Sequence, residues 1–171
     1  MATIFREIGK LSVWDGHRGP DEQWLQPGDV RADAVGKLKA KDNKLSVFFV
    51  DQATDVRRIA VAYAATRDDV KEVVYCLVDD SHLALAQIDI SKSACNVPDE
   101  LVSSWHADML HLTAPKLAEV ARVLQHHGTF GSLLPVDVGK LINRHVAIGL
   151  IKNEHLNEKL KGRLAAPKYQ P

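Results

Sequence analysis

Two short apolar runs, 45–50 and 73–78, each end in aspartate and are separated by a helical pattern. The first run leads into Asp51, and the second leads into Asp79 and Asp80. Apolar residues between the runs recur with the helical period. This order predicts a strand–helix–strand unit in which the two strands are parallel neighbours. Their carboxyl ends would then share one edge of the sheet, where open α/β folds usually bind ligands.

Turn residues, caps and periodicity predict the other elements. Alternation from Leu83 to Ile90 favours a strand, although the leucines and alanines there also suit a helix. Thr113 suits the N-cap of one helix and Gly128 its left-handed C-cap. The remaining expected elements are a strand over 10–14 and helices over 29–38, 98–112, 136–151 and 153–164.

These elements predict a mixed α/β fold, with a small sheet that contains the parallel unit and a helical C-terminal half. We expect residues 1–95 to form the sheet portion and residues 96–165 to form a helical portion packed on it. Residues 166–171, with two prolines, are expected to be a flexible tail. A chain of 171 residues suits one compact domain with a core that needs no disulfide or metal.

The formal net charge is zero, which excludes a general attraction of the whole chain for nucleic acid or anionic membranes. The two signs are unevenly distributed along the sequence. Residues 51–100 contain five basic and ten acidic residues, and residues 137–171 contain seven basic and three acidic ones. Two oppositely charged solvated faces explain this split. Self-association of an acidic face with a basic face is the alternative, and it would weaken with salt.

Cysteine content and hydropathy predict a cytoplasmic protein. Cys76 and Cys95 form neither a Cys-x-x-Cys motif nor a disulfide framework, and Cys76 is expected to be a small buried apolar residue. The first seven residues lack the continuous apolar stretch of a signal peptide. No run approaches the roughly 18 apolar residues that would span a membrane.

The aspartates at the strand ends are the first candidate site. Asp51, Asp79 and Asp80 are of the right type to hold Mg²⁺ or Mn²⁺ for phosphodiester chemistry. The alternative is that they initiate turns and cap helices, as aspartate often does at strand ends. No glycine-rich phosphate loop follows either strand. Apart from these metal ions, no cofactor is predicted.

A second candidate lies in the loop 15–20, where His17 and Arg18 stand next to each other. A solvent-facing histidine and arginine near Trp14 and Trp24 suit anion binding or acid–base chemistry. The alternative is an ordinary polar turn. His106 and His111 are five residues apart and do not share a helix face, so they do not match the helical zinc pair at i and i+4.

A third candidate is the basic C-terminal region. Lys140 and Arg144 are placed to contact phosphates, and two consecutive helices there resemble the order of a helix-turn-helix. Glu154 and Glu158 lie on the second helix, however, and no cluster of Ser, Thr, Asn or Gln suits base edges.

The function predicted from these observations is non-enzymatic. We expect a protein–protein interaction module that works within its own oligomer or as a small subunit of a larger cytoplasmic assembly. A metal-dependent hydrolase or nuclease at the acidic strand ends is one alternative. A nucleic-acid-binding module that uses the basic C-terminal helices is the other.

Overall fold

The computed structural model describes residues 2–14 and 28–170, and it contains one six-stranded sheet. All of its strand pairs are antiparallel, in the order β4-β5-β2-β1-β3-β6. The strands are β1 (Thr3–Glu7), β2 (Leu45–Val50), β3 (Val73–Asp79), β4 (Ile90–Lys92), β5 (His106–Met109) and β6 (Thr129–Leu133).

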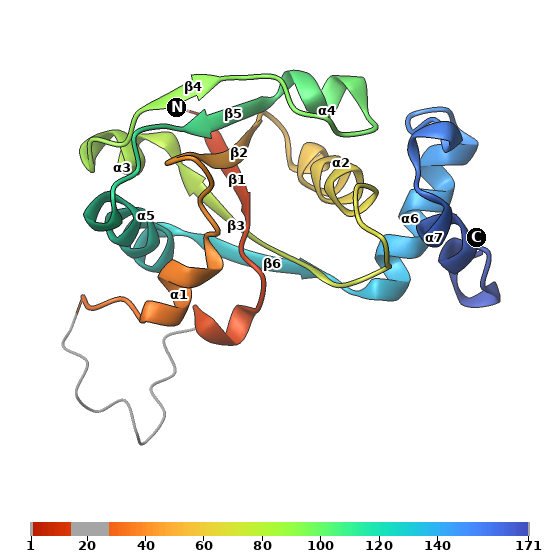
Figure 1. Cartoon of the computed structure of the whole chain (residues 1–171), viewed down its shortest axis with the longest axis horizontal. Coiled ribbons are helices and arrows are strands. Elements are labelled where there is room, and N and C mark those ends of the chain that lie inside the picture. The colour runs from red at the N-terminus through yellow and green to blue at the C-terminus, as the bar shows by residue number, and fades with distance from the viewer. Residues whose placement is uncertain (1, 15–27, 171) are drawn as a thin grey trace.

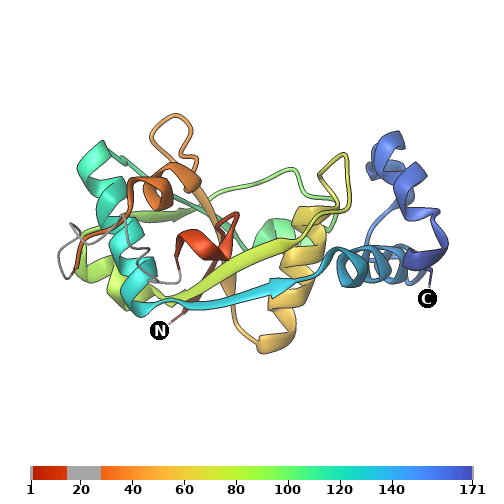
Figure 2. The ribbon, with the colours of Figure 1, turned by 90° about the horizontal axis from the view of Figure 1, so that it is seen from below.

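Helices cover both faces of the sheet, so the described chain forms three layers (Figure 1). The α-helices are α1 (Ala32–Lys37), α2 (Ala53–Ala64), α3 (Asp80–Leu85), α4 (Glu100–Ser104), α5 (Ala114–His127), α6 (Pro135–Ala147) and α7 (Glu158–Leu164). Helices α1, α3 and α5 pack on one face, and α2 and α4 pack on the other. Helices α6 and α7 continue the second layer beyond α2, which makes the molecule elongated (Figure 2).

The central strand β1 is buried on both faces. Ile4 faces the core under α1 and α5, whereas Phe5 faces the core under α2, and both side chains are fully buried. Thr3 lies opposite Val50 of β2 on one side and opposite Asp79 of β3 on the other. A strand covered on both faces loses the polar–apolar alternation of a half-exposed strand. This explains why residues 3–7 carry no clear strand pattern.

The predicted mixed α/β class is confirmed, but the predicted parallel strand pair is wrong. The strands β2 and β3 and the helix α2 between them are present as expected. Because β2 and β3 both pair antiparallel with β1, they run in the same direction with β1 inserted between them. The strand that separates them comes from the N-terminus, outside the segment from which the pairing was predicted.

Four other predicted elements differ from the structure. Residues 10–14 contain a 3-10 helix, η1 (Leu11–Val13), in place of a strand. The stretch 83–90 is divided between α3 and the start of β4, so its predicted strand is mostly wrong. The helix expected over 98–112 ends at Ser104, and β5 follows. Gly128 does end α5, but with a φ of −81° rather than in the left-handed region.

The C-terminal half contributes β5 and β6 to the sheet in addition to its helices. Its end is packed rather than extended, because η4 (Pro167–Tyr169) rests on α6. Tyr169 is buried, and its ring lies directly over Gly139. Asn143 on α6 donates hydrogen bonds to the carbonyl oxygens of Leu164 (3.1 Å) and Tyr169 (2.9 Å).

Two matched glycine substitutions test this C-terminal packing. A Cβ at Gly139 would overlap the ring of Tyr169, so Gly139→Ala should lower the free energy of unfolding by about 1–3 kcal/mol. At the exposed Gly162 of α7, an added Cβ meets no atom within 4 Å. Gly162→Ala should therefore raise the free energy of unfolding by up to about 1 kcal/mol. Urea unfolding of both variants measures the difference. Equal stabilities would contradict the packing of Tyr169 on Gly139.

Candidate functional site

An arginine bridges β1 and β2 where the two strands part. Their pairing stops at Phe5 and Phe48. Just beyond, the Arg6 guanidinium donates from Nη1 to the carbonyl oxygen of Ser46 (2.7 Å) and from Nη2 to that of Leu38. Since Leu38 is the C-cap residue of α1, this side chain ties the helix end to the sheet.

A cavity of about 200 Å³ lies beside this split, and we call it the inner cavity. Its walls come from β1, β2, β5, the C-terminal end of α2 and the segment that follows β4. The lining residues are Arg6, Glu7, Ser46, Phe48, Tyr63, Thr66, Cys95, Asn96, Val97 and His106.

Arg6 has no carboxylate partner within ion-pair distance in the described chain. Its side chain is 8% exposed, and its Nε is buried without a hydrogen-bond acceptor among the described residues. Burial lowers the pKa of Arg6, and the nearby Tyr63 and Glu7 oppose that shift. A buried charge that is not paired reduces the stability of a fold. Among the residues that line this cavity, Arg6 is therefore the charged group without an ion pair and with an unused buried hydrogen-bond donor.

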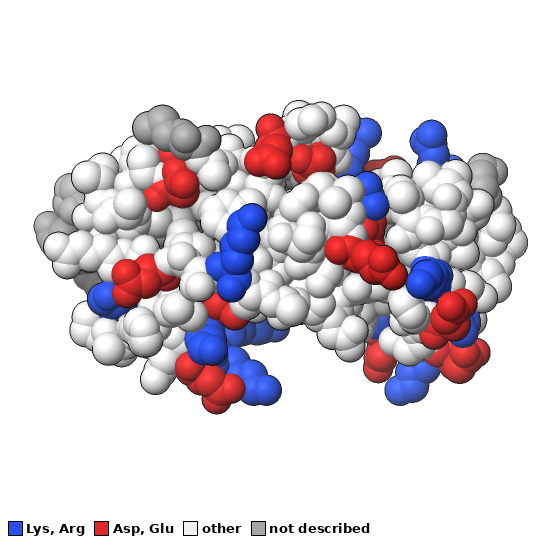
Figure 3. Space-filling view, turned by 90° about the horizontal axis from the view of Figure 1, so that it is seen from above, with Lys and Arg blue, Asp and Glu red and all other residues white. Residues whose placement is uncertain are grey.

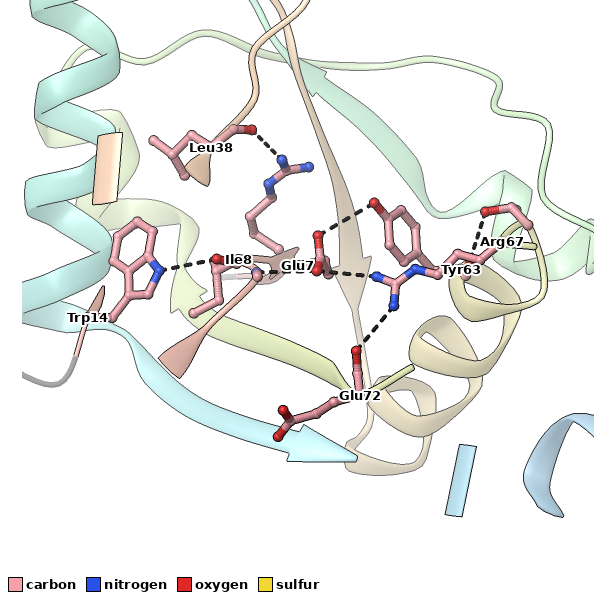
Figure 4. Close-up of polar contacts among 10 residues, drawn as sticks. Glu7, Ile8, Trp14, Leu38, Tyr63, Arg67 and Glu72 are labelled. Carbon is pink, nitrogen blue, oxygen red and sulfur yellow. Dashed lines mark hydrogen bonds and ion pairs between the residues drawn. The ribbon is translucent and has the colours of Figure 1, made fainter. Parts of the chain in front are cut away.

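Glu7, the adjacent carboxylate, is already engaged by other groups (Figure 4). Its Oε1 accepts from Nη2 of Arg67 (3.2 Å) and from the backbone N–H of Gly9 (3.2 Å). Its Oε2 lies 3.5 Å from the hydroxyl of Tyr63. Arg67 also donates to the carbonyl oxygen of Glu72 (3.2 Å) and stacks on the ring of Tyr63. The charge of Glu7 is therefore balanced by Arg67 rather than by Arg6.

His106 also lines the inner cavity and belongs to a network with two hydroxyls and a carboxylate. Its Nδ1 is 2.9 Å from the Oγ of Ser93, and that hydroxyl donates to Oδ2 of Asp108 (2.8 Å). Ser46 donates to the other oxygen of Asp108 (3.3 Å). In a catalytic triad the histidine lies between serine and carboxylate. Here Ser93 bonds both His106 and Asp108, whereas Nε2 of His106 is 3.9 Å from Oδ1 of Asp108, too far for a hydrogen bond, so the arrangement does not match that of a triad.

Cys95 is half-buried in the wall of the cavity, and burial raises the pKa of its thiol. A thiol with a raised pKa is a poor nucleophile at neutral pH. Cys76 is fully buried on the opposite face of the sheet, as predicted, and burial raises its pKa to about 12. Because both pKa values are raised, neither thiol has the lowered pKa of a catalytic thiolate.

Two larger adjoining spaces, of about 540 and 360 Å³, continue from the inner cavity along α4, and we call them together the outer trough. The first shares Thr66, Asn96 and Val97 with the inner cavity. The further lining residues of the trough are Arg58, Ala65, Pro98, Asp99, Glu100, Leu101, Ser103, Gly149, Leu150, Lys152, His155 and Asn157.

A buried ion pair lines the trough. Arg58 on α2 donates two hydrogen bonds to the carboxylate of Asp99, at 2.7 and 2.9 Å. The same carboxylate, 1% exposed, accepts from the backbone N–H groups of Leu101 and Val102 and so caps α4. Close by, burial lowers the pKa of His145, whose buried Nδ1 has no partner in the described chain. The pair positions α4 and with it one wall of the trough.

The segment 95–97 leaves its backbone N–H groups without partners in the main chain. No N–H of Cys95, Asn96 or Val97 donates to another backbone group of the described residues. The N–H of Val97 faces the thiol of Cys95. The side-chain amide of Asn96 makes no hydrogen bond with the described part of the chain either. Unpaired backbone groups of an extended segment are available to a second polypeptide.

The predicted acidic residues lie at one edge of the sheet but are kept apart by β1. Asp51 follows Val50, while Asp79 lies opposite Thr3 on the far side of β1, a separation of two strand spacings of about 4.8 Å each. Asp79 accepts from the N–H of Ser81 (2.9 Å) and caps α3, and Asp80 accepts from that of Ala2 (3.1 Å). Within 2–14 and 28–170, no three Asp, Glu, His or Cys side chains gather as a metal site.

The other predicted residues are placed as follows. His17 and Arg18 lie outside the described residues. Lys140 and Arg144 are exposed on α6.

The basic C-terminal segment and the acidic segment 51–100 face each other within the chain. Three of the basic residues that follow α6 pair with acidic residues of the body: Lys152 with Glu100 (3.4 Å), Lys159 with Asp68 (3.8 Å) and Arg163 with Asp69 (3.8 Å). The face drawn in Figure 3 accordingly shows both signs of charge interspersed among neutral residues.

Comparisons with known proteins add no assignment. No protein-family model, no curated protein and no solved structure matches this chain. In the described part of the chain, every helix is too short or too polar to cross a membrane.

The cap of α3 gives a pH-dependent prediction. Hydrogen bonds from Ser81 lower the pKa of Asp79 below its ordinary value of 3.8, so its ionised form stabilises the folded state. Asp79→Ala should therefore lower the Tm at pH 7. The difference from the parent should shrink as the pH falls below 3.8 through the lowered folded pKa. Thermal melts across this range measure the effect.

Asp51→Ala is the matched control, because its exposed carboxylate accepts no hydrogen bond from the described residues. Its Tm should follow that of the parent at each pH. A decrease in the Tm of Asp79→Ala that stays the same at every pH would rule out a stabilising role for the charge of the cap.

Proposed function

We propose that this chain is a non-enzymatic binding protein that takes an extended segment of a partner protein into the outer trough. The observation that carries this proposal is the segment 95–97, whose N–H groups make no main-chain hydrogen bond with the described residues and of which Asn96 and Val97 line a space large enough for a ligand. The two spaces of the trough, about 540 and 360 Å³, fall within the range of ligand sites, roughly 300–1,000 Å³.

The backbone of the partner is recognised in the manner of strand addition. An extended peptide that lies along residues 95–97 gains main-chain hydrogen bonds, which supply affinity without regard to sequence. The segment is held in place from both sides. The hydroxyl of Ser103 donates to the carbonyl oxygen of Cys95 (2.7 Å), and the cap of α4 begins at Asp99. A fixed segment loses less conformational entropy on binding than a mobile one.

Side chains around the trough supply the sequence preference. Leu101 is 46% exposed in the wall and offers an apolar contact. His155 and Asn96 present polar side chains that make no hydrogen bond with the described residues. The exposed pair of Lys152 with Glu100 lies at the rim, where charges set partner choice more than affinity. A segment with one apolar side chain between polar ones matches this arrangement.

Selection from a displayed random-peptide library tests the proposal. The purified protein should enrich peptides that bind with one-to-one stoichiometry. Asn96→Pro removes the central N–H of the segment. It should weaken the binding of a selected peptide at least about tenfold, which is a loss of roughly 1.4 kcal/mol in binding free energy. Asn96→Ala keeps that N–H and should change the affinity less. Calorimetric titration measures both variants.

Circular dichroism confirms that each variant is folded before the affinities are compared. A library that yields no specific peptide, or peptides that bind Asn96→Pro as tightly as the parent, would exclude recognition by the 95–97 backbone.

A further inference from the structure

Arg6 does not line the outer trough, so its charge has no role in the proposed peptide site. Two other partly buried arginines each have a carboxylate, since Arg58 pairs with Asp99 and Arg67 pairs with Glu7. Arg6 is more buried than either, yet its two hydrogen bonds go to neutral carbonyl oxygens. Buried charges in proteins are usually paired with an opposite charge. Arg6 lacks such a pair among the described residues, so its guanidinium is available to an anionic ligand.

The carboxylates near Arg6 are occupied by other donors. Glu7 accepts from Arg67, Tyr63 and Gly9, and Asp108 accepts from the hydroxyls of two serines. In the described chain neither comes within 4.0 Å of the Arg6 guanidinium. A guanidinium has five N–H donors, of which two are used here, and the free ones suit the oxygen atoms of an anion.

Arg6 is one of the residues that line the inner cavity. Arg6 and Ser46, which share a hydrogen bond, both line it, and the free amide of Asn96 and the ring of His106 line it as well. Its volume of about 200 Å³ equals roughly seven water molecules at about 30 Å³ each. This space suits a phosphate group or a short carboxylic acid, and it is too small for a nucleotide.

We propose that the inner cavity binds a small oxyanion, a carboxylate or phosphate group, with Arg6 as its cationic partner. The anion supplies the direct ion pair that no carboxylate of the described chain makes with Arg6, since Glu7, which also lines the cavity, acts on Arg6 only at longer range. Asn96 adds a neutral donor at the opening toward the outer trough. This site does not depend on peptide binding, because the anion needs only groups that line the inner cavity.

Titration with sodium phosphate and with sodium acetate, each against sodium chloride of equal ionic strength, tests the site. The Tm of the parent should rise in a saturable way with at least one of the two anions. Arg6→Gln should lose this rise, with binding weakened at least about tenfold. Arg122→Gln is the matched control, because Arg122 is exposed on α5 and should respond like the parent.

A rise with phosphate alone identifies a phosphate site, and a rise with acetate alone identifies a carboxylate site. No rise with either anion up to about 100 mM, or an equal rise in Arg6→Gln, overturns the proposal. Because these titrations contain no peptide, a failed peptide selection leaves their outcome unchanged.

A second measurement on the unsubstituted protein covers the case in which Arg6→Gln does not fold. Cys95 lines the inner cavity, whereas Cys76 is fully buried on the other face of the sheet and should stay unmodified. The effective anion should slow alkylation of Cys95 by iodoacetamide several-fold relative to chloride. Equal rates of alkylation in phosphate, acetate and chloride overturn the proposal as well.

Discussion

Strand β1 hydrogen-bonds to β2 on one side and to β3 on the other, and the arrangement of the whole sheet depends on these two ladders. Insertion of β1 makes the sheet antiparallel throughout and sets Asp51 and Asp79 on opposite sides of the inserted strand. It also brings Arg6 to the point where β1 and β2 part. The inner cavity is therefore a product of the same insertion that separates the acidic strand ends.

The elements that were predicted correctly are those with strong local signals. The apolar runs of β2 and β3, the period of α2 and the Thr113 cap of α5 each act within a few residues, so sequence shows them. The neighbours of a strand depend on residues far along the chain. Pairing of β1 between β2 and β3 leaves no local mark, because both faces of β1 are buried and alternation is lost. In α4 and β5, a helix-like spacing of apolar residues was overridden by the sheet.

The candidate site was less predictable than the fold. Arg6 and Glu7 interrupt an apolar stretch that begins at Ile4, and that interruption is the only sequence signal of the inner cavity. A charged residue in such a stretch is most simply expected at a surface. Only the tertiary structure shows that Arg6 is buried and that the carboxylate beside it belongs to Arg67. The opposite charges of segments 51–100 and 137–171 were visible in the sequence, but their pairing within one chain was not.

The position of β1 also affects the order in which the protein can form during synthesis. Thr3 pairs with Val50 and Asp79, so the two ladders of β1 cannot both form until β3 has been translated. At about 5–20 residues per second, the ribosome needs roughly 4–15 s to add the intervening residues. Ile4 and Phe5 have no partner strand until β2 is made, one edge of β1 stays open until β3 follows, and β6 arrives later still. The strand that lies deepest in the finished sheet is thus exposed longest in the growing chain, where chaperones or other chains can reach it.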